Sequence, residues 1–319
     1  MSAGQLWHSL RNADGTWQGF FGLITGQEGN KPGQFLDVRC AGVFTSLHVV
    51  GSVNGELWHT IRYPNTWQKT FGLIESQAKN NPGPFTVFDC AGIQSDLHVV
   101  GLANGHLWHT IRFGATEKWQ TEFGSIDGVT DPPESSWTYV ACAAIGESLH
   151  ILGMVSGALF HTVRNPEGTW QKTWDYYNPS NPLPLWAISC SGVGTELQIA
   201  INSGDTLYHT IMNPGPTWQS FWGSITGQMG GKPQHVTDFV SVGCAGIGSA
   251  LHVVSRGDTH NVPPANPTFT LWHTIRNPNT WKKPYDLIEA HIPGNNPQID
   301  LISCAGVGTS LHLVGTSAW

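Results

Sequence analysis

Apolar and polar positions alternate in short runs along the whole chain, and Gly, Pro, Asn and Ser separate the runs. Residues 35–76 contain four such runs, "FLDVRCAGV", "SLHVVGSV", "ELWHTIRY" and "TWQKTFGLI". Period-2 alternation rich in β-branched and aromatic residues indicates β-strands, and we find no helical-period segment of useful length. Asn54-Gly55 and Asn104-Gly105 match the preferred two-residue hairpin turn, whose two central residues both need a positive φ. The pattern therefore predicts an all-β protein built from hairpins.

The set of four strands is predicted six times. An "LWH"-type segment marks each copy, with its histidine at His8, His59, His109, His161, His209 and His273. A "CAGxxxxLHVVG" segment marks it a second time, with its cysteine at Cys40, Cys90, Cys142, Cys190, Cys244 and Cys304. Four antiparallel strands repeated at intervals of about fifty residues are typical of a β-propeller. Six copies predict six blades.

The two ends of the chain predict how the ring closes. The sequence begins inside a third strand, "QLWHSL", and ends after a second strand, "SLHLVGTSAW". We expect the N-terminal strands to join the C-terminal strands in one blade, because closure removes sheet edges that would otherwise pair with other chains. Residues 1–319 are thus expected to form a single propeller domain. Its expected blades span about 35–76, 85–127, 137–177, 185–226, 236–290, and 299–319 plus 1–25.

The turn at Asn54-Gly55 predicts the register of its hairpin. Pairing outward from the turn places Gly51 opposite Trp58 and Val50 opposite His59, so Trp58 and His59 point to opposite faces. We expect the missing side chain at Gly51 to leave room for the Trp58 indole. His48 lies near His59 on the same face.

The histidines equivalent to His48 are His98, His150, His252 and His312, and Gln198 takes the sixth position. Glutamine can mimic the hydrogen bonds of a neutral imidazole but is a poor metal ligand. We therefore interpret this set as structural, with hydrogen bonds to the backbone of the next blade. The cysteines occupy equivalent positions of separate blades, so we expect six buried free thiols and no disulfides.

Composition limits the classes of partner. Only 12% of residues are charged, the net charge is -7, and no run of Lys and Arg occurs, which argues against nucleic acid. No signal peptide is recognised, and no apolar run approaches the ~18 residues of a membrane span. We expect cytoplasmic synthesis, with release from the cell as an open alternative, and no insertion into membranes.

The sequence lacks clear motifs for phosphate binding, nucleophilic catalysis, metal binding and sialidase activity. We find no phosphate-binding loop or nucleophile elbow, and no third ligand recurs beside His48 and His59, so we expect neither a metal nor a cofactor. "NADGTW" at 12–17 matches the Asp-box turn of sialidases poorly. Catalysis generally needs one distinct group of residues, whereas six near-equal copies favour repeated binding. We therefore expect a binding protein and not an enzyme.

The arrangement "NGxLWH…TW…FGxI" followed by "CAG…LHVVG" resembles the tectonin-type propeller lectins through all six repeats. It is also similar to the bacterial PLL-type lectins, which use the same small blade. The resemblance implies a multivalent lectin that binds fucose-like or O-methylated sugars on cell surfaces or glycoconjugates, in grooves between blades. It also implies oligomers and a role in recognition or defence.

An indole, an imidazole and a guanidinium suit a sugar, because an aromatic face stacks on its C–H groups while planar donors bind its hydroxyls. Transferred position by position, the carbohydrate-binding candidates are Trp7, His8, Arg11, Trp58, His59, Arg62, Trp108, His109, Arg112, His161, Arg164, Trp272, His273 and Arg276. A purely packing role for these residues is the alternative. The blade with Phe160 is expected to bind more weakly, and the blade with Tyr208, His209 and Met212 weakly or not at all.

Two other functions stay open at this point. A scaffold for protein partners would use the rim of the ring and the insertion at 255–270, which contains Arg256-Gly257-Asp258. That tripeptide occurs often by chance and reads first as part of a surface loop. A glycosidase or lyase ranks last.

Overall fold

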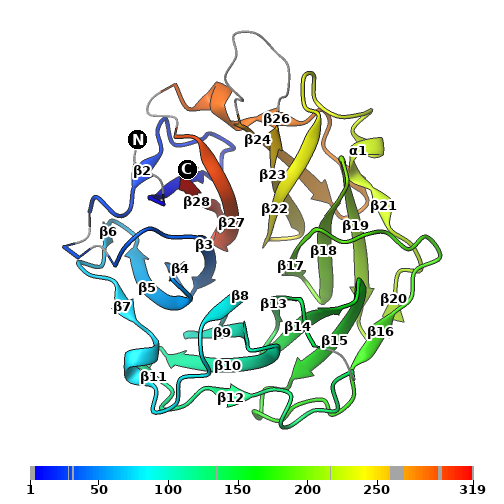
Figure 1. Cartoon of the computed structure of the whole chain (residues 1–319). Coiled ribbons are helices and arrows are strands. Elements are labelled where there is room, and N and C mark those ends of the chain that lie inside the picture. The colour runs from blue at the N-terminus through cyan, green and yellow to red at the C-terminus, as the bar shows by residue number, and fades with distance from the viewer. Residues whose placement is uncertain are drawn as a thin grey trace. The chain divides into compact units, whose positions relative to one another are not determined.

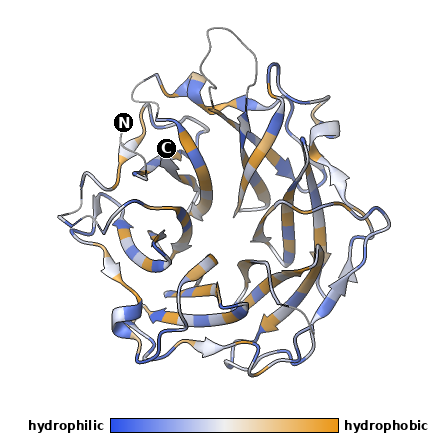
Figure 2. Cartoon of the chain, in the orientation of Figure 1, coloured by the Kyte–Doolittle hydropathy of each residue, from blue (hydrophilic) through white to orange (hydrophobic). Residues whose placement is uncertain are grey.

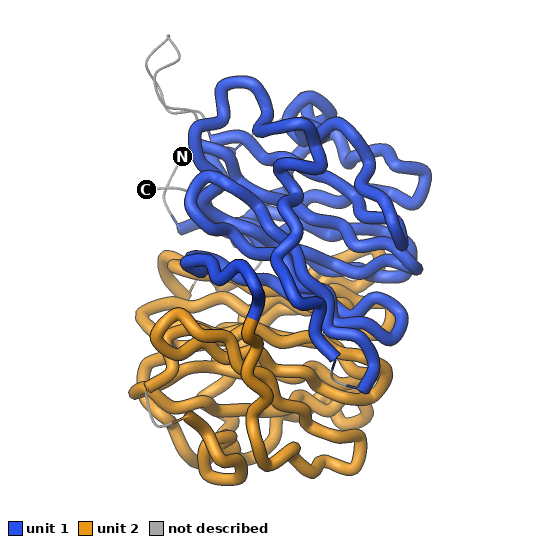
Figure 3. Tube along the Cα trace, turned by 90° about the vertical axis from the view of Figure 1, so that its right-hand side faces the viewer, with its two compact units in different colours: residues 1–27, 179–319 blue, residues 28–178 orange. Residues whose placement is uncertain are grey.

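The computed structural model describes residues 4–27, 29–30, 32–133, 136–215, 217–258, 269–293 and 297–317. It confirms the predicted all-β, six-bladed β-propeller, with an antiparallel sheet for every blade (Figure 1). The described residues fall into two compact units of three blades each, residues 28–178 and residues 1–27 with 179–319 (Figure 3). The expectation of a single domain stays a prediction.

The unit of residues 28–178 contains blades one to three. Blade one consists of β3 (Asp37–Val43), β4 (Ser46–Val53), β5 (Glu56–Tyr63), β6 (Thr66–Trp67) and β7 (Gly72–Leu73). Blade two consists of β8 (Phe85–Ile93), β9 (Asp96–Ala103), β10 (His106–Phe113), β11 (Lys118–Trp119) and β12 (Gly124–Ser125). Blade three consists of β13 (Tyr139–Ile145), β14 (Ser148–Val155), β15 (Ala158–Arg164) and β16 (Asp175–Tyr177).

The other unit contains blades four to six. Blade four consists of β17 (Ala187–Val193), β18 (Glu196–Ser203), β19 (Thr206–Asn213), β20 (Thr217–Trp218) and β21 (Gly223–Ser224). Blade five consists of β22 (Asp238–Ile247), β23 (Ala250–Asp258), β24 (Phe269–Asn277), β25 (Thr280–Trp281) and β26 (Asp286–Leu287). Blade six consists of β27 (Ile299–Val307), β28 (Ser310–Ser317), β1 (Leu6–Arg11) and β2 (Gly22–Leu23). The pairing of β1 with β28 confirms that N-terminal strands complete the last blade.

The fourth strand of a blade is shorter than the sequence suggests. In blade one the expected strand "TWQKTFGLI" forms two separate pieces, because Trp67 pairs with Arg62 while Gly72 pairs with His59. Residues 68–71 between them leave the ladder. In the part of the chain that the structure describes, helix is limited to α1 (Ile225–Gln228) and two 3-10 turns at Glu75–Gln77 and Ile288–His291. In the described residues no helix is both long and apolar enough to cross a membrane.

The predicted hairpin register is confirmed. Asn54 and Gly55 have φ values of 54° and 83°, and Trp58 lies opposite Gly51 as expected. The space above Gly51, however, belongs to Phe35 and not to the Trp58 indole. A Cβ at Gly51 would lie 2.4 Å from the Phe35 ring. The glycine is needed because the chain entering the blade packs its aromatic ring directly on this strand.

Hydrophobic and hydrophilic residues alternate along the strands (Figure 2). Most of the hydrophobic residues in the long strands are buried. All six cysteines are buried and free, which confirms the expected thiols.

The tripeptide Arg256-Gly257-Asp258 lies within β23 and not in a surface loop. Arg256 is 7% exposed and forms ion pairs with Asp258 and Asp300, so it is not available for adhesion. Residues 259–268 of the predicted insertion at 255–270 lie outside the described residues.

Candidate functional site

Every blade carries a hydrogen-bonded pair of side chains between its second and third strands. In blade one, His48 Nδ1 lies 3.1 Å from His59 Nε2. The equivalent pairs are His98–His109, His150–His161, His252–His273 and His312–His8, at 3.0 to 3.1 Å. In blade four, Gln198 Oε1 accepts from His209 Nε2 at 3.1 Å. These histidines therefore bond a side chain of their own blade, where the sequence suggested the backbone of the next blade.

The next blade of the same unit supplies an arginine and a tryptophan to four of these pairs. The Trp119 ring meets His59 edge-on at 5.3 Å, and Trp170 meets His109 in the same way at 5.5 Å. Trp281 and Trp17 repeat the contact on His209 and His273. These tryptophans lie in or beside the fourth-strand segments. Site prediction missed them, although "TW" recurs there in most copies.

Burial lowers the pKa of histidines in several of these pairs. It lowers the pKa of His48 to about 3, with a smaller contribution from the Arg112 guanidinium. It lowers the pKa of His98 to about 4, with Arg164 acting in the same direction. Arg276 lies close enough to Gln198 for a contact of 3.5 Å. Loss of imidazole charge follows mainly from desolvation, and the arginine adds to it.

The Trp and His residues predicted to share a groove therefore lie on opposite faces of their own sheet. His59 lies with Arg112 and Trp119 of the following blade, whereas Trp58 is on the opposite face of its own sheet. Trp58, Trp108 and Trp272 are half-buried, Trp7 is buried, and the paired histidines at His8, His59, His109, His161 and His273 are at most 5% exposed. The five arginines Arg11, Arg62, Arg112, Arg164 and Arg276 are half-buried. Whether any of them binds sugar stays a prediction.

Blade three has a carboxylate that the other pairs lack. His161 pairs in register with Asp175, and its Nδ1 donates to Asp175 Oδ2 at 3.4 Å. Gln171 Nε2 donates to the same oxygen at 3.1 Å. The equivalent position is Gly22, Gly72, Gly124, Gly223 or Asp286 in the other blades. Asp286 Oδ1 accepts from His291 at 2.7 Å, so among the described residues only Asp175 binds a paired histidine.

The three side chains form a line, Asp175–His161–His150, and not a cluster around one point. Among the described residues, no three or more His, Cys, Asp or Glu side chains are grouped to hold a metal ion. Because His161 Nδ1 donates to the carboxylate, its Nε2 is the acceptor in the bond to His150 Nδ1. His150 Nε2 then carries the lone pair, and no described residue donates to it. The carboxylate thus fixes the tautomer of both rings.

His150 is also the most accessible member of the paired set. It is half-buried, whereas every other paired histidine is buried. Burial, and then His161, lower the pKa of His150 to about 4, so its ring is neutral at pH 7. The hydrogen bond from His161 lowers the pKa of Asp175, which keeps the carboxylate charged. Blade three therefore presents a neutral nitrogen base with a carboxylate behind it.

No family model matches this chain, and no curated protein matches it. Solved structures do share its fold. The polysaccharide lyase Uly1 aligns at a TM-score of 0.50 and 9% identity, covering 91% of each chain. An ulvan lyase from a new polysaccharide lyase family aligns at a TM-score of 0.50 and 11% identity, over 95% of this chain and 82% of its own. A subtype N10 neuraminidase-like protein (A/little yellow-shouldered bat) aligns at 0.50 and 10%, over 91% and 97%.

These likenesses correct two expectations. The tectonin and PLL resemblance is confirmed only as far as the six-bladed fold, because nothing in the comparisons shows such a lectin. The expectation of a lectin that is not an enzyme is wrong, since the propellers matched over about nine-tenths of the chain include enzymes that cleave polysaccharides. The six copies are also unequal at Asp175. The segment "TWDYY", where blade one has "TFGLI" and blade two has "EFGSI", was the signal for this difference.

Proposed function

We propose that the chain is a carbohydrate-active enzyme that cleaves an acidic polysaccharide by elimination, with His150 Nε2 as the base. The observation that carries the proposal is the carboxylate at Asp175, which lies behind the histidine pair of blade three and has no counterpart among the hydrogen bonds of the described residues in the other blades. The likeness in fold to polysaccharide lyases supports the class of substrate.

Elimination suits the chemistry of this line of side chains. In a uronic acid residue, the C–H bond beside the carboxyl group is the acidic one. Its proton moves to His150 Nε2, the electron pair forms a carbon–carbon double bond, and the glycosidic C–O bond breaks. The departing oxygen takes a proton from water. Asp175, acting through His161, stabilises the imidazolium that forms, as a carboxylate does behind a catalytic histidine.

Hydrolysis suits the site less well. A glycosidase generally uses two carboxyl groups on either side of the scissile bond. Asp175 is instead engaged by His161 and Gln171, and the accessible group at the end of the line is an imidazole nitrogen. The proposed reaction therefore leaves an unsaturated sugar at the new chain end.

Product analysis tests the proposal. We expect the purified protein to act on at least one of polygalacturonate, alginate, glucuronan and ulvan. New chain ends and ultraviolet absorbance from the conjugated double bond should rise together, one for one. Reducing ends that appear without the absorbance would identify a hydrolase and contradict elimination. No new chain ends from any of the four polymers would contradict the proposal as a whole.

A further inference from the structure

In each of three blades, an asparagine in the loop that leads into the blade forms two hydrogen bonds with the main chain of one residue near the outer strands. We call this pair of bonds the asparagine clamp. In blade one, Asn30 Nδ2 donates to Phe71 O at 3.1 Å, and Phe71 N donates to Asn30 Oδ1 at 2.8 Å. Asn80 holds Phe123 and Asn181 holds Trp222 with the same pair of bonds, at 2.8 to 3.1 Å. One primary carboxamide thus satisfies the main-chain donor and acceptor of one residue.

Blade five lacks this clamp. Its entering loop reads "TGQMGGKPQHV" where blade one has "TGQEGNKPGQF", so Gly231 occupies the position of Asn30 and Tyr285 that of Phe71. The loop bonds to itself instead, with Gly231 N donating to Thr226 O at 2.9 Å. Among the described residues, no side chain bonds the main-chain N–H or C=O of Tyr285. The two groups that an asparagine satisfies elsewhere are left without their amide.

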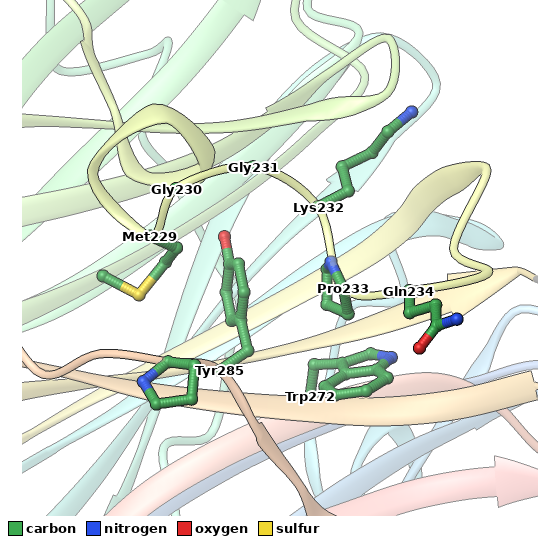
Figure 4. Close-up of a pocket in the computed structure, with 9 residues that line it drawn as sticks. Met229, Gly230, Gly231, Lys232, Pro233, Gln234, Trp272 and Tyr285 are labelled. Carbon is green, nitrogen blue, oxygen red and sulfur yellow. The ribbon is translucent and has the colours of Figure 1, made fainter.

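A pocket lies where the clamp would be. Its volume is about 250 Å³, and its lining comes from Met229–Gln234, Trp272 and Pro284–Tyr285 (Figure 4). A Cβ built on Gly230 or Gly231 would meet nothing within 4 Å, so the space of the missing side chain is open. The rings of Tyr285 and Trp272 form two of its walls.

The polar groups around the pocket point to a neutral ligand. Trp272 Nε1 donates to Thr270 Oγ1 at 2.8 Å, so this edge of the indole has its partner and its ring is left for contact. Lys232 Nζ is held 2.6 Å from Asp205 Oδ2 and 2.6 Å from Thr237 O. In Figure 4 its side chain points away from Trp272 and Tyr285. The lysine therefore does not supply a charge to a ligand between the rings.

We propose that this pocket binds a planar primary carboxamide, which replaces the missing asparagine side chain on the main chain of Tyr285 and packs against Trp272. A primary amide offers a donor and an acceptor on one edge. A trans secondary amide has its N–H and C=O on opposite sides and cannot make both bonds. The group can belong to a small molecule, or to an Asn or Gln side chain of another protein. The proposal is independent of the elimination reaction.

Binding of chosen probes tests this assignment. We expect nicotinamide, or the peptide acetyl-Gly-Gln-Gly-methylamide, to shift the Trp272 indole signal in ¹⁵N-labelled protein in a saturable way. The Gln side chain is the one primary amide of this peptide. Saturation by nicotinamide alone indicates a small-molecule ligand, and saturation by the peptide indicates a protein segment. N-methylnicotinamide should bind about tenfold more weakly, because it loses one of the two hydrogen bonds. Equal binding of the N-methyl compound, or no shift with either probe, would overturn the proposal.

Two variants locate the site. Gly231→Asn supplies the clamp that blades one, two and four use, and should abolish binding. The φ of Gly231 is 120°, which strains an asparagine, so Trp272→Leu serves as the second variant. It should weaken binding about tenfold by removing one wall. The matched control is Trp108→Leu, at the same position of clamped blade two, and should leave affinity unchanged. An equal loss in both leucine variants would contradict the assignment.

Discussion

Lowering the pH from 7 to 4 is expected to unfold this protein. Burial lowers the pKa of His48 and His209 to about 3, and that of His98, His150 and His252 to about 4. An unfolded histidine titrates near 6.5, so the unfolded state gains protons first. The stability that these groups contribute is present above pH 6.5 and is lost as the pH falls toward their folded pKa. The contribution of each of these five histidines to the free energy of unfolding falls by about 2 kcal/mol between pH 7 and pH 5.

Buried carboxyl groups act in the opposite direction. Burial raises the pKa of Glu75 and Glu289 to about 7 and that of Asp89 to about 6, so their contribution is largest in acid and is lost as the pH rises through these values. Each returns about 1 to 2 kcal/mol between pH 7 and 5. The five histidines outweigh them, and the net loss of several kcal/mol is comparable with the 5–15 kcal/mol stability of a typical domain.

Circular dichroism at constant ionic strength measures this transition. We expect a midpoint between pH 6.5 and 4.5. Replacing a titrating pair member by His98→Gln should move the midpoint to lower pH, because Gln198 shows that glutamine keeps the hydrogen bond without titrating. Full folding at pH 4 would show that the histidine pairs are not held neutral.

The variant His150→Gln is expected to lower turnover by about 10² to 10⁴ fold on the polymer that the wild type cleaves. This range is typical of removing a general base. Glutamine offers no basic nitrogen, but it fills the same position in blade four. In blade three its amide N–H can donate to His161 Nε2, as the His150 Nδ1–H does. The variant should therefore fold normally and lose activity at kcat, with little change in KM.

His98→Gln is the matched control for that experiment. His98 occupies the same position in blade two, and its partner His109 faces Gly124 where His161 faces Asp175. We expect turnover within about twofold of the wild type. Equal losses in the two variants would mean that the pairs act through stability, and would remove the special role of blade three.

Local sequence patterns predicted the features that are formed by strands consecutive in the sequence. The Asn54-Gly55 turn determines the register of its hairpin, and this register brings His48 and His59 onto one face. Repetition of that hairpin predicted the blades and the closure of the last one. The blades can be recognised in the sequence because the two strands of each central hairpin lie within about twenty residues of each other.

Contacts across longer distances escaped prediction. Trp119 reaches His59 from the next blade, and Asn30 reaches Phe71 from 41 positions away. Gly51 was correctly paired with Trp58, yet Phe35 fills the space above it. Asp175 was missed because the expected fourth strand breaks into pieces, so its register against His161 could not be counted from a turn.

The tautomer of His150 tests the central claim most directly, and it can be measured without a substrate. Long-range ¹H–¹⁵N spectra at pH 7 distinguish a protonated from an unprotonated ring nitrogen. We predict a neutral ring with the proton on Nδ1 and the lone pair on Nε2, because Asp175 directs the bonds of His161 and His150. In Asp175→Asn this preference should be lost. A His150 ring that is charged at pH 7, or protonated on Nε2, would contradict the account.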